Sequence, residues 1–454
     1  MNINRITVID TGGLAARAIA RRLRALKVFA VIEDAAGLSP EAFSERVIGV
    51  VVAGSGLSLH SDASALTAAL KSGLPVLALG RNARALALAM GGAPSGCRVE
   101  KGTALVKFST CALFEGLTTC ERYFERAEDI DLPEGAECIA EGGDGFVAAF
   151  ADMAKGIYAA QFNVESNDPD GMKILKNFAS SICADDCAWT MPAFLDECLG
   201  RLRTCCPSGN VVMAVSGGVM STVAAAVAVR AFGERCKCVL CDTSFLRKGE
   251  AQRVRRVFDS EMGIAIEVLD LTKETREALT GIADNKLKRE TVSRVILKAL
   301  SKEGDVVVRG SGRAGSFALV PLETLFKEEV KELGELLGLN ASLLQRQPFP
   351  ESGLAVRVSG EATIEKIELV READDIFTNE VEQAGLDKKL WQYYATLSPA
   401  DDGGYVIVLH ALVSSEALAG YAFRLPYDLI ERTVMRVLGD NAGIAGVLYD
   451  VTGR

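Results

Sequence analysis

A chain of 454 residues is too long to fold around one core, so its length predicts two or three domains. Its net charge of −10, with lysine and arginine concentrated nowhere, excludes a nucleic-acid-binding surface, because such a surface needs clustered positive charge to neutralise phosphates. No apolar run approaches the length of a membrane span and the N-terminus leads into a strand, so we expect no membrane contact and a cytoplasmic location.

In the first part of the chain, to about Cys183, short apolar segments alternate with segments of helical periodicity. This alternation is typical of an α/β domain with a parallel sheet. The predicted strands are 5–10, 47–54 and 74–80, and the predicted helices are 14–26 and 63–73.

A second α/β unit follows, and its first strand-to-helix turn reads Ser216-Gly217-Gly218. A turn of this kind directs bare backbone N–H groups and a helix N-terminus at an anion, so it predicts phosphate binding. The strands of this unit are predicted at 211–215, 237–244 and 264–270, and the helices at 221–233 and 250–263.

After about Asn340 the pattern changes, with predicted helices at 364–385 and 429–439 and strands at 405–412 and 446–451. We therefore expect two parallel-sheet α/β domains and a smaller α+β C-terminal domain, over residues 1–188, 189–349 and 350–454. The last helix carries an apolar stripe at spacings of one turn, which predicts either a dimer interface or packing within its own domain. The stripe consists of Leu429, Ile430, Val434 and Val437.

The chain has twelve cysteines, and CKCVLCD holds three of them, Cys236, Cys238 and Cys241. Their spacing alternates like a strand entering a sheet and lacks the paired knuckles of a zinc site. We expect free thiols that pack as small buried hydrophobes, with no metal bound and no disulfides in a cytosolic protein.

Seven segments, in this order, carry a resemblance to a known family: QFNVES (161–166), GMKILKNFASSIC (171–183), AWTMPAFLDE (188–197), SGGVMST (216–222), CDTSFLRKGEA (241–251), RLPYDLIER (424–432) and VLYDVTG (447–453). By these segments the chain resembles glutamine-hydrolysing GMP synthase over essentially its whole length.

This resemblance implies a flavodoxin-like class I glutamine amidotransferase domain, a PP-loop ATP pyrophosphatase domain of the adenine nucleotide α-hydrolase-like fold, and a C-terminal dimerisation domain that pairs two chains. The implied reaction belongs to purine biosynthesis. ATP with Mg²⁺ adenylates xanthosine monophosphate (XMP), and ammonia drawn from glutamine then displaces AMP.

Two members of the glutaminase triad are missing. The family places its cysteine nucleophile at a strand-to-helix elbow, where this chain has Gly80 followed by Arg81. Asn163 takes the position of the histidine base, and only Glu165, the carboxylate that orients the base, remains. Nucleophile and base act as one unit, so we expect no glutaminase activity.

The predicted phosphate loop matches the family's loop sequence except at one functional position. Met220 stands where the family has an aspartate that helps hold Mg²⁺, and a thioether is a poor ligand for a hard cation. ATP remains a candidate ligand, Mg²⁺ is not expected to be held as in the family, and Asp242 is the candidate replacement carboxylate. The retained loop residues are Ser216, Gly217, Gly218, Val219, Ser221 and Thr222.

Several basic residues match family positions that face the nucleotide. Arg247 with Lys248, and Lys288 with Arg289, could attract phosphate or could lie on a solvated face. Arg357 matches a substrate-side position, and Arg454 is the candidate substitute for a lysine of the family's longer C-terminal tail. The family's mobile lid, which precedes 321–327, is absent here.

Three functions compete, in this order. The first is a pseudoenzyme that binds a purine nucleotide (ATP, or a nucleotide like XMP) and acts as a responsive binding or scaffold protein. The second is a ligase that still amidates a purine nucleotide with free ammonia or another amine. The third, an intact GMP synthase, would need a cysteine and a histidine where the chain has neither. In each case we expect a homodimer formed through residues 350–454.

Overall fold

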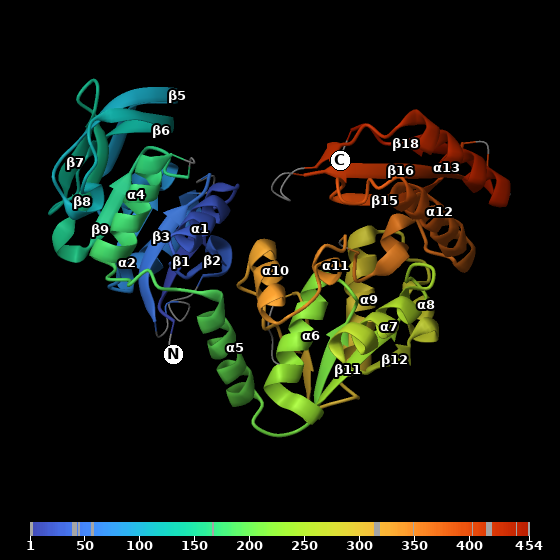
Figure 1. The fold of residues 1–454 in the computed structure, drawn as a ribbon. Coiled ribbons are helices and arrows are strands. Elements are labelled where there is room, and N and C mark those ends of the chain that lie inside the picture. Colours follow the sequence, from blue (N-terminus) through green and yellow to red (C-terminus); the bar gives the residue numbers. More distant parts are fainter. Residues whose placement is uncertain are drawn as a thin grey trace. The chain divides into compact units, whose positions relative to one another are not determined.

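The computed structural model describes residues 3–38, 43, 46–55, 59–165, 168–312, 318–347, 349–401, 403–414, 420–441 and 443–452. The chain divides into two compact units, Met1–Glu197 and Cys198–Arg454 (Figure 1). The predicted domain borders at 188–189 and 349–350 stay predictions, because the second unit holds both of the remaining sheets.

The first unit contains a nine-stranded mixed sheet in the order β2-β1-β3-β4-β9-β8-β7-β5-β6. Its strands β2, β1, β3, β4 and β9 are parallel, which is the flavodoxin-like half that the sequence predicts. Val50, Val51 and Val52 are fully buried, as expected for a parallel strand covered on both faces. The strands are β1 Arg5–Asp10, β2 Ala30–Asp34, β3 Val47–Ala53, β4 Val76–Leu79, β5 Ala93–Phe108, β6 Cys120–Asp131, β7 Glu137–Gly142, β8 Val147–Asp152 and β9 Ile157–Ala160.

One helix lies between β1 and β2 and another between β3 and β4, whereas β6, β7, β8 and β9 follow one another with shorter connections (Figure 1). The helices of this region are α1 Ala15–Ala25, α2 Leu59–Lys71, α3 Arg81–Ala89, α4 Pro169–Asn177 and α5 Met191–Cys205.

The second unit begins with a five-stranded parallel sheet in the order β12-β11-β10-β13-β14. Because β10 lies at the centre, its carboxyl end is the point where the strand order reverses, and ligands of open α/β sheets bind there. The strands are β10 Val211–Val215, β11 Cys236–Asp242, β12 Ile266–Asp270, β13 Val306–Val308 and β14 Ala318–Leu319, and the helices are α6 Val219–Phe232, α7 Glu250–Met262, α8 Thr272–Leu279, α9 Asn285–Leu300, α10 Lys327–Leu336 and α11 Ala341–Leu344.

A smaller sheet follows, in which β16 pairs with β15 and β17 antiparallel and with β18 parallel. This is the expected α+β region, and one hydrophobic cluster runs from Val212 of β10 through Leu354 to Ile407 of β16, so the two sheets of this unit share a core. The elements are η7 Gly353–Arg357, α12 Ile364–Gln383, β15 Gln392–Pro399, β16 Tyr405–Val413, β17 Tyr421–Ala422, α13 Tyr427–Asp440 and β18 Ile444–Tyr449.

The apolar stripe of the last helix packs largely inward. Leu429 and Val437 are 1% and 0% exposed, and Ile430 packs against the shared core. Leu429 and Val437 are therefore not free for a partner chain, so for these two residues packing within their own unit holds, whereas Ile430 and Val434 are only partly buried. The large apolar side chains that α13 does expose are Tyr427, Met435 and Leu438.

All twelve cysteines are free thiols, with Cys238 buried on β11 and its neighbours Cys236 and Cys241 half-buried. Across the part of the chain that the structure describes, no three or more histidine, cysteine or acidic side chains gather closely enough to hold a metal ion. Among the same residues no helix is long and apolar enough to cross a membrane.

Candidate functional site

The turn between β4 and α3 is a tight elbow with Gly80 at its tip. Gly80 has φ 61° and ψ −129°, a conformation that glycine adopts far more easily than residues with a side chain. A Cβ atom on Gly80 would lie 4.0 Å from Oδ1 of Asn163. The structure thus brings together the two positions predicted for nucleophile and base. Glycine has no nucleophilic atom and a carboxamide is not a general base, so the pair cannot start the chemistry.

Arg122 holds the segment that carries Asn163. Its guanidinium is 5% exposed, donates to Oδ1 of Asp168 at 2.8 Å and to the carbonyl of Asn163 at 3.1 Å, and lies 5.4 Å from the ring centre of Phe162. Glu165 accepts a hydrogen bond from the backbone N–H of Val164 at 3.1 Å. The sequence alone did not single out Arg122, because its partners lie 41 and 46 residues away along the chain.

The predicted phosphate loop forms the turn between β10 and α6. Helix α6 has Gly218 as its N-cap, without a side-chain cap, so its first N–H groups are left for an anion. Inside the turn, Oγ of Ser221 accepts from the N–H of Ser216 at 3.1 Å and donates to the carbonyl of Gly218 at 3.0 Å. Oγ1 of Thr222 donates to the same carbonyl at 3.0 Å. These bonds are internal to the turn and need no metal.

Two neighbouring glycines let other segments approach this loop. A Cβ on Gly310, just beyond β13, would come within 2.6 Å of the backbone of Ser221. A Cβ on Gly217, whose φ is 74°, would lie 2.4 Å from Val254 and 3.0 Å from Nη1 of Arg346. Val254 of α7 and Arg346 therefore reach the loop only because position 217 has no side chain.

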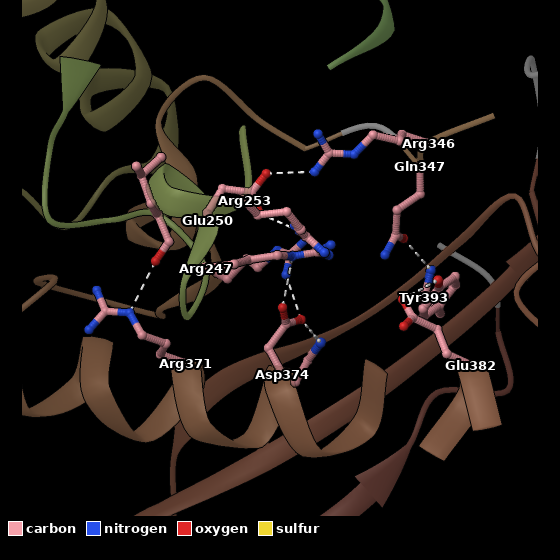
Figure 2. A network of polar contacts seen from close by, with 12 residues as sticks. Arg247, Glu250, Arg253, Arg346, Gln347, Arg371, Asp374, Glu382 and Tyr393 are labelled. Carbon is pink, nitrogen blue, oxygen red and sulfur yellow. Dashed lines mark hydrogen bonds and ion pairs between the residues drawn. The ribbon is translucent and has the colours of Figure 1, made fainter. Parts of the chain in front are cut away.

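Arg346 connects the loop to helix α7 (Figure 2). Its Nη1 donates to the carbonyl of Gly217 at 2.6 Å, and its Nη2 to Oε1 of Glu250 at 2.7 Å. Arg253 binds the other carboxylate oxygen of Glu250, whose side chain is only 4% exposed. Burial raises the pKa of Glu250, but the charges of Arg346 and Arg253 outweigh burial and hold this pKa below its ordinary value.

A second cluster contains Arg247 and Arg357, two of the predicted site residues. Arg247 and its partner Asp374 are labelled in Figure 2. The two arginines share Asp374 of α12: Nε of Arg247 lies 3.0 Å from Oδ2, and Nη1 of Arg357 lies 2.6 Å from Oδ1. The ring of Phe349 lies 4.9 Å from one guanidinium and 5.1 Å from the other.

The charge of this cluster is not balanced. Two guanidiniums face one carboxylate, so the group carries one positive charge more than Asp374 neutralises. Burial lowers the pKa of Arg357, and the charge of Arg247 lowers it further, whereas Asp374 acts in the opposite direction. An anion is the group that would relieve this repulsion.

The remaining predicted residues are less closely grouped. Asp242 ends β11 beside Asp270 of β12, and its Oδ1 accepts from the N–H of Ser244 at 3.0 Å. Lys248 pairs with Glu372 of α12 at 2.7 Å. Arg289 is exposed on α9. It lines a cavity of about 560 Å³ together with Glu290, Ser293, Arg294, Leu297 and Glu351.

Lys288 does not lie where a phosphate-binding lysine would. It is 0% exposed, and its ammonium donates to the carbonyls of Ala355 and Val358 at 3.0 and 2.7 Å. Burial and the charge of Lys366 lower its pKa to about 8. The prediction that Lys288 attracts phosphate is therefore replaced by a structural role for this side chain. Arg454 lies outside the described residues.

Because Glu250 is paired with Arg346 and Arg253, we expect its contribution to the free energy of unfolding to depend on pH. A carboxyl with a depressed pKa stabilises the fold above its unfolded pKa, and this stabilisation disappears as the pH falls through its folded pKa. We expect Glu250→Gln to lower the free energy of unfolding by about 2 kcal/mol at neutral pH. In denaturant titrations the difference from the parent chain should shrink steadily on acidification.

Glu368→Gln is the matched control, because Glu368 pairs with Arg371 but is 54% exposed. Its effect should stay below about 0.5 kcal/mol. A Glu250→Gln effect that equals the control, or that grows on acidification, would contradict the assigned electrostatics.

Known proteins resemble the chain along its full length. The family model described as GMP synthase C terminal domain matches residues 379–454. A "GMP synthase [glutamine-hydrolyzing]" from Syntrophomonas wolfei is 31% identical over 503 residues, covering 100% of this chain and 98% of the relative. One from Parafrankia sp. is 32% identical over 506 residues, covering 99% and 95%.

Two solved structures of glutamine amidotransferases align with part of the chain. One from Thermotoga maritima has 14% identity and a TM-score of 0.35, covering 40% of this chain and 99% of that one. Another from Methylobacillus flagellatus has 16% identity and a TM-score of 0.31, covering 37% and 72%. With full-length relatives above 30% identity, the chain belongs to the family of glutamine-hydrolysing GMP synthases.

Proposed function

We propose that this chain is a family member without glutaminase activity that binds a purine nucleotide and acts as a nucleotide-responsive binding or scaffold protein. The observation that carries the proposal is the elbow, where Gly80 faces Asn163. A thioester cannot form at a position without a thiol. Ammonia would then have to come from outside the chain.

Nucleotide binding is supported by two groups of residues in the second unit. The turn from Ser216 to Thr222 leaves N–H groups at the start of α6, and Arg247 with Arg357 carries an unbalanced positive charge. Both features favour phosphorylated ligands. We assign ATP to the turn and a nucleotide like XMP to the arginine pair.

The donor set of the loop does not fit Mg²⁺. Mg²⁺ prefers oxygen ligands in near-octahedral geometry, and the side chain at the family's aspartate position is the thioether of Met220. We therefore assign no catalytic step to a metal here. Phosphate charge would be balanced by backbone dipoles and arginines.

A second candidate is a ligase that amidates a purine nucleotide with free ammonia. It is favoured by Asp242 and Asp270, which are register partners at the carboxyl ends of neighbouring strands. Two carboxylates at that edge would supply oxygen ligands if a cation were recruited with the nucleotide. Formation of AMP from ATP in the presence of ammonium separates this candidate from the first.

We predict that glutamine is not hydrolysed, whether or not nucleotides are present. The measurement is release of glutamate from glutamine, with Glu165→Gln as the control chain. A steady rate above the uncatalysed background that Glu165→Gln abolishes would contradict the prediction. Gly80→Cys combined with Asn163→His should restore little activity, because Arg81 follows the elbow, where an oxyanion hole needs backbone donors that are free to reach the substrate.

We predict that ATP binds weakly and nearly independently of Mg²⁺. Calorimetric titrations with Mg²⁺ or with a chelator, at matched ionic strength, should give affinities within about threefold of each other, because no carboxylate stands at position 220. Met220→Asp should introduce a Mg²⁺-dependent gain. Tight ATP binding that strictly requires Mg²⁺ in the parent chain would contradict the prediction and show that another carboxylate helps hold the metal. Asp242→Asn would then test whether Asp242 is that carboxylate.

We also propose a homodimer formed through the C-terminal region, with the exposed Met435 and Leu438 of α13 in place of the buried stripe. These side chains are 70% and 41% exposed and lie one turn apart. We predict that Met435→Lys combined with Leu438→Lys yields a monomer by light scattering at micromolar concentration. Leu336→Lys, at a residue of α10 that is 44% exposed, should leave the dimer intact. A monomeric parent chain would refute the proposal.

A further inference from the structure

The carbonyl of Gly217 has a charged partner from a distant segment. Nη1 of Arg346 donates to it at 2.6 Å across 129 residues of sequence. Gly217 sits at φ 74°, and any Cβ there would lie 3.0 Å from the same Nη1. Glycine at position 217 thus permits the positive φ of the turn and also leaves room for the guanidinium of Arg346.

The contact fixes the direction of the next N–H group. No cis peptide bond occurs in the described backbone, and in a trans peptide the C=O and N–H bonds point to opposite sides. Because the Gly217 carbonyl points to Arg346, the N–H of Gly218 points away from Arg346, on the side opposite the guanidinium. Because the N–H of Gly218 is already oriented before an anion binds, binding does not cost the free energy of reorienting this donor.

The contact also adds charge behind the loop. Glu250 is shared by Arg346 and Arg253, so this group, like the Asp374 cluster, holds two guanidiniums for one carboxylate. The Arg346 side chain is 23% exposed, and its position is fixed from both ends of the guanidinium. A hydrogen bond donated by a cation polarises the peptide that accepts it and strengthens the N–H dipole on the other side.

Resting on the proposed binding of nucleotide at this loop, we propose that Arg346 is the positioning residue of the phosphate turn. It holds the Gly217–Gly218 peptide in the anion-binding orientation and supplies part of the positive potential that a metal ion would otherwise supply. The ligand class is a pyrophosphate group, free or as part of a nucleotide. Arg346 acts through the peptide and does not itself contact the ligand.

Inorganic pyrophosphate is the probe, titrated calorimetrically into the intact chain in the presence of a chelator. Arg346→Gln should weaken binding about tenfold, because a charge-assisted hydrogen bond is lost. Arg346→Lys keeps the charge and one donor and should recover most of the affinity. Arg253→Gln is the matched control: Arg253 also pairs with Glu250, but its side chain is 48% exposed, so solvent screens its charge and its loss should change the affinity less than about twofold.

A second readout separates positioning from mere structural support. In a Met220→Asp background with Mg²⁺ present, the metal supplies positive charge, so Arg346→Gln should cost less affinity there than in the parent chain. Melting temperatures of all variants are recorded to confirm that each is folded.

The outcomes are distinct. If the parent chain binds neither pyrophosphate nor ATP, the proposed function fails. If the parent binds and a folded Arg346→Gln chain binds equally well, the inference about Arg346 fails while nucleotide binding stands. Equal losses from Arg346→Gln and Arg253→Gln, or a loss that Met220→Asp with Mg²⁺ leaves unchanged, would also overturn the positioning role.

Discussion

The buried carboxylate of Asp374 holds the second unit together at its candidate binding site. It forms an ion pair with Arg247, which follows β11, and accepts hydrogen bonds from Arg357 of η7 and from the backbone N–H of Ala395 in β15 at 3.0 Å. Three segments thus converge on one group that is 2% exposed. A buried charge is tolerated only when it is paired and hydrogen-bonded, so the arginines cannot move independently of the carboxylate. Their unbalanced charge follows from this arrangement.

At single positions of this chain, the backbone structure is kept while the side chain that the family's chemistry uses is replaced. At the elbow, glycine satisfies the backbone requirement of φ 61° without strain, so removing a reactive side chain leaves the turn intact. At the phosphate loop, the hydroxyls of Ser221 and Thr222 close the turn internally, so a methionine at position 220 does not disturb it. Family membership and architecture therefore do not by themselves establish that the chain carries out the family's reaction.

Much of the architecture was predictable from the sequence, because apolar periodicity and strand-to-helix turns are local signals. The same motifs predicted that Gly80 and Asn163 occupy the positions of nucleophile and base, and the structure sets them face to face. The buried position of Lys288 matches neither alternative that the sequence offered, phosphate attraction or a solvated face, because a long basic side chain looks the same in sequence whether it reaches solvent or two backbone carbonyls.

Two other features lay beyond the sequence. An apolar stripe does not say which surface it covers, and Leu429 and Val437 cover their own core. Arg122, Glu250 and Arg346 were not identified as site residues because their partners are remote along the chain, and a single arginine or glutamate carries no periodic signal. Only the assembled fold shows which charges are shared.

We propose above all that this chain binds nucleotide but does not carry out the family's adenylation. The most direct measurement is exchange of labelled pyrophosphate into ATP, with XMP and Mg²⁺ present and ammonia left out so that an adenylate could revert, alongside the melting temperature of the same samples. We expect no exchange above the protein-free blank while ATP raises the melting temperature, because a ligand that binds the native state stabilises it. Sustained exchange that requires XMP would contradict the claim and identify a working ligase.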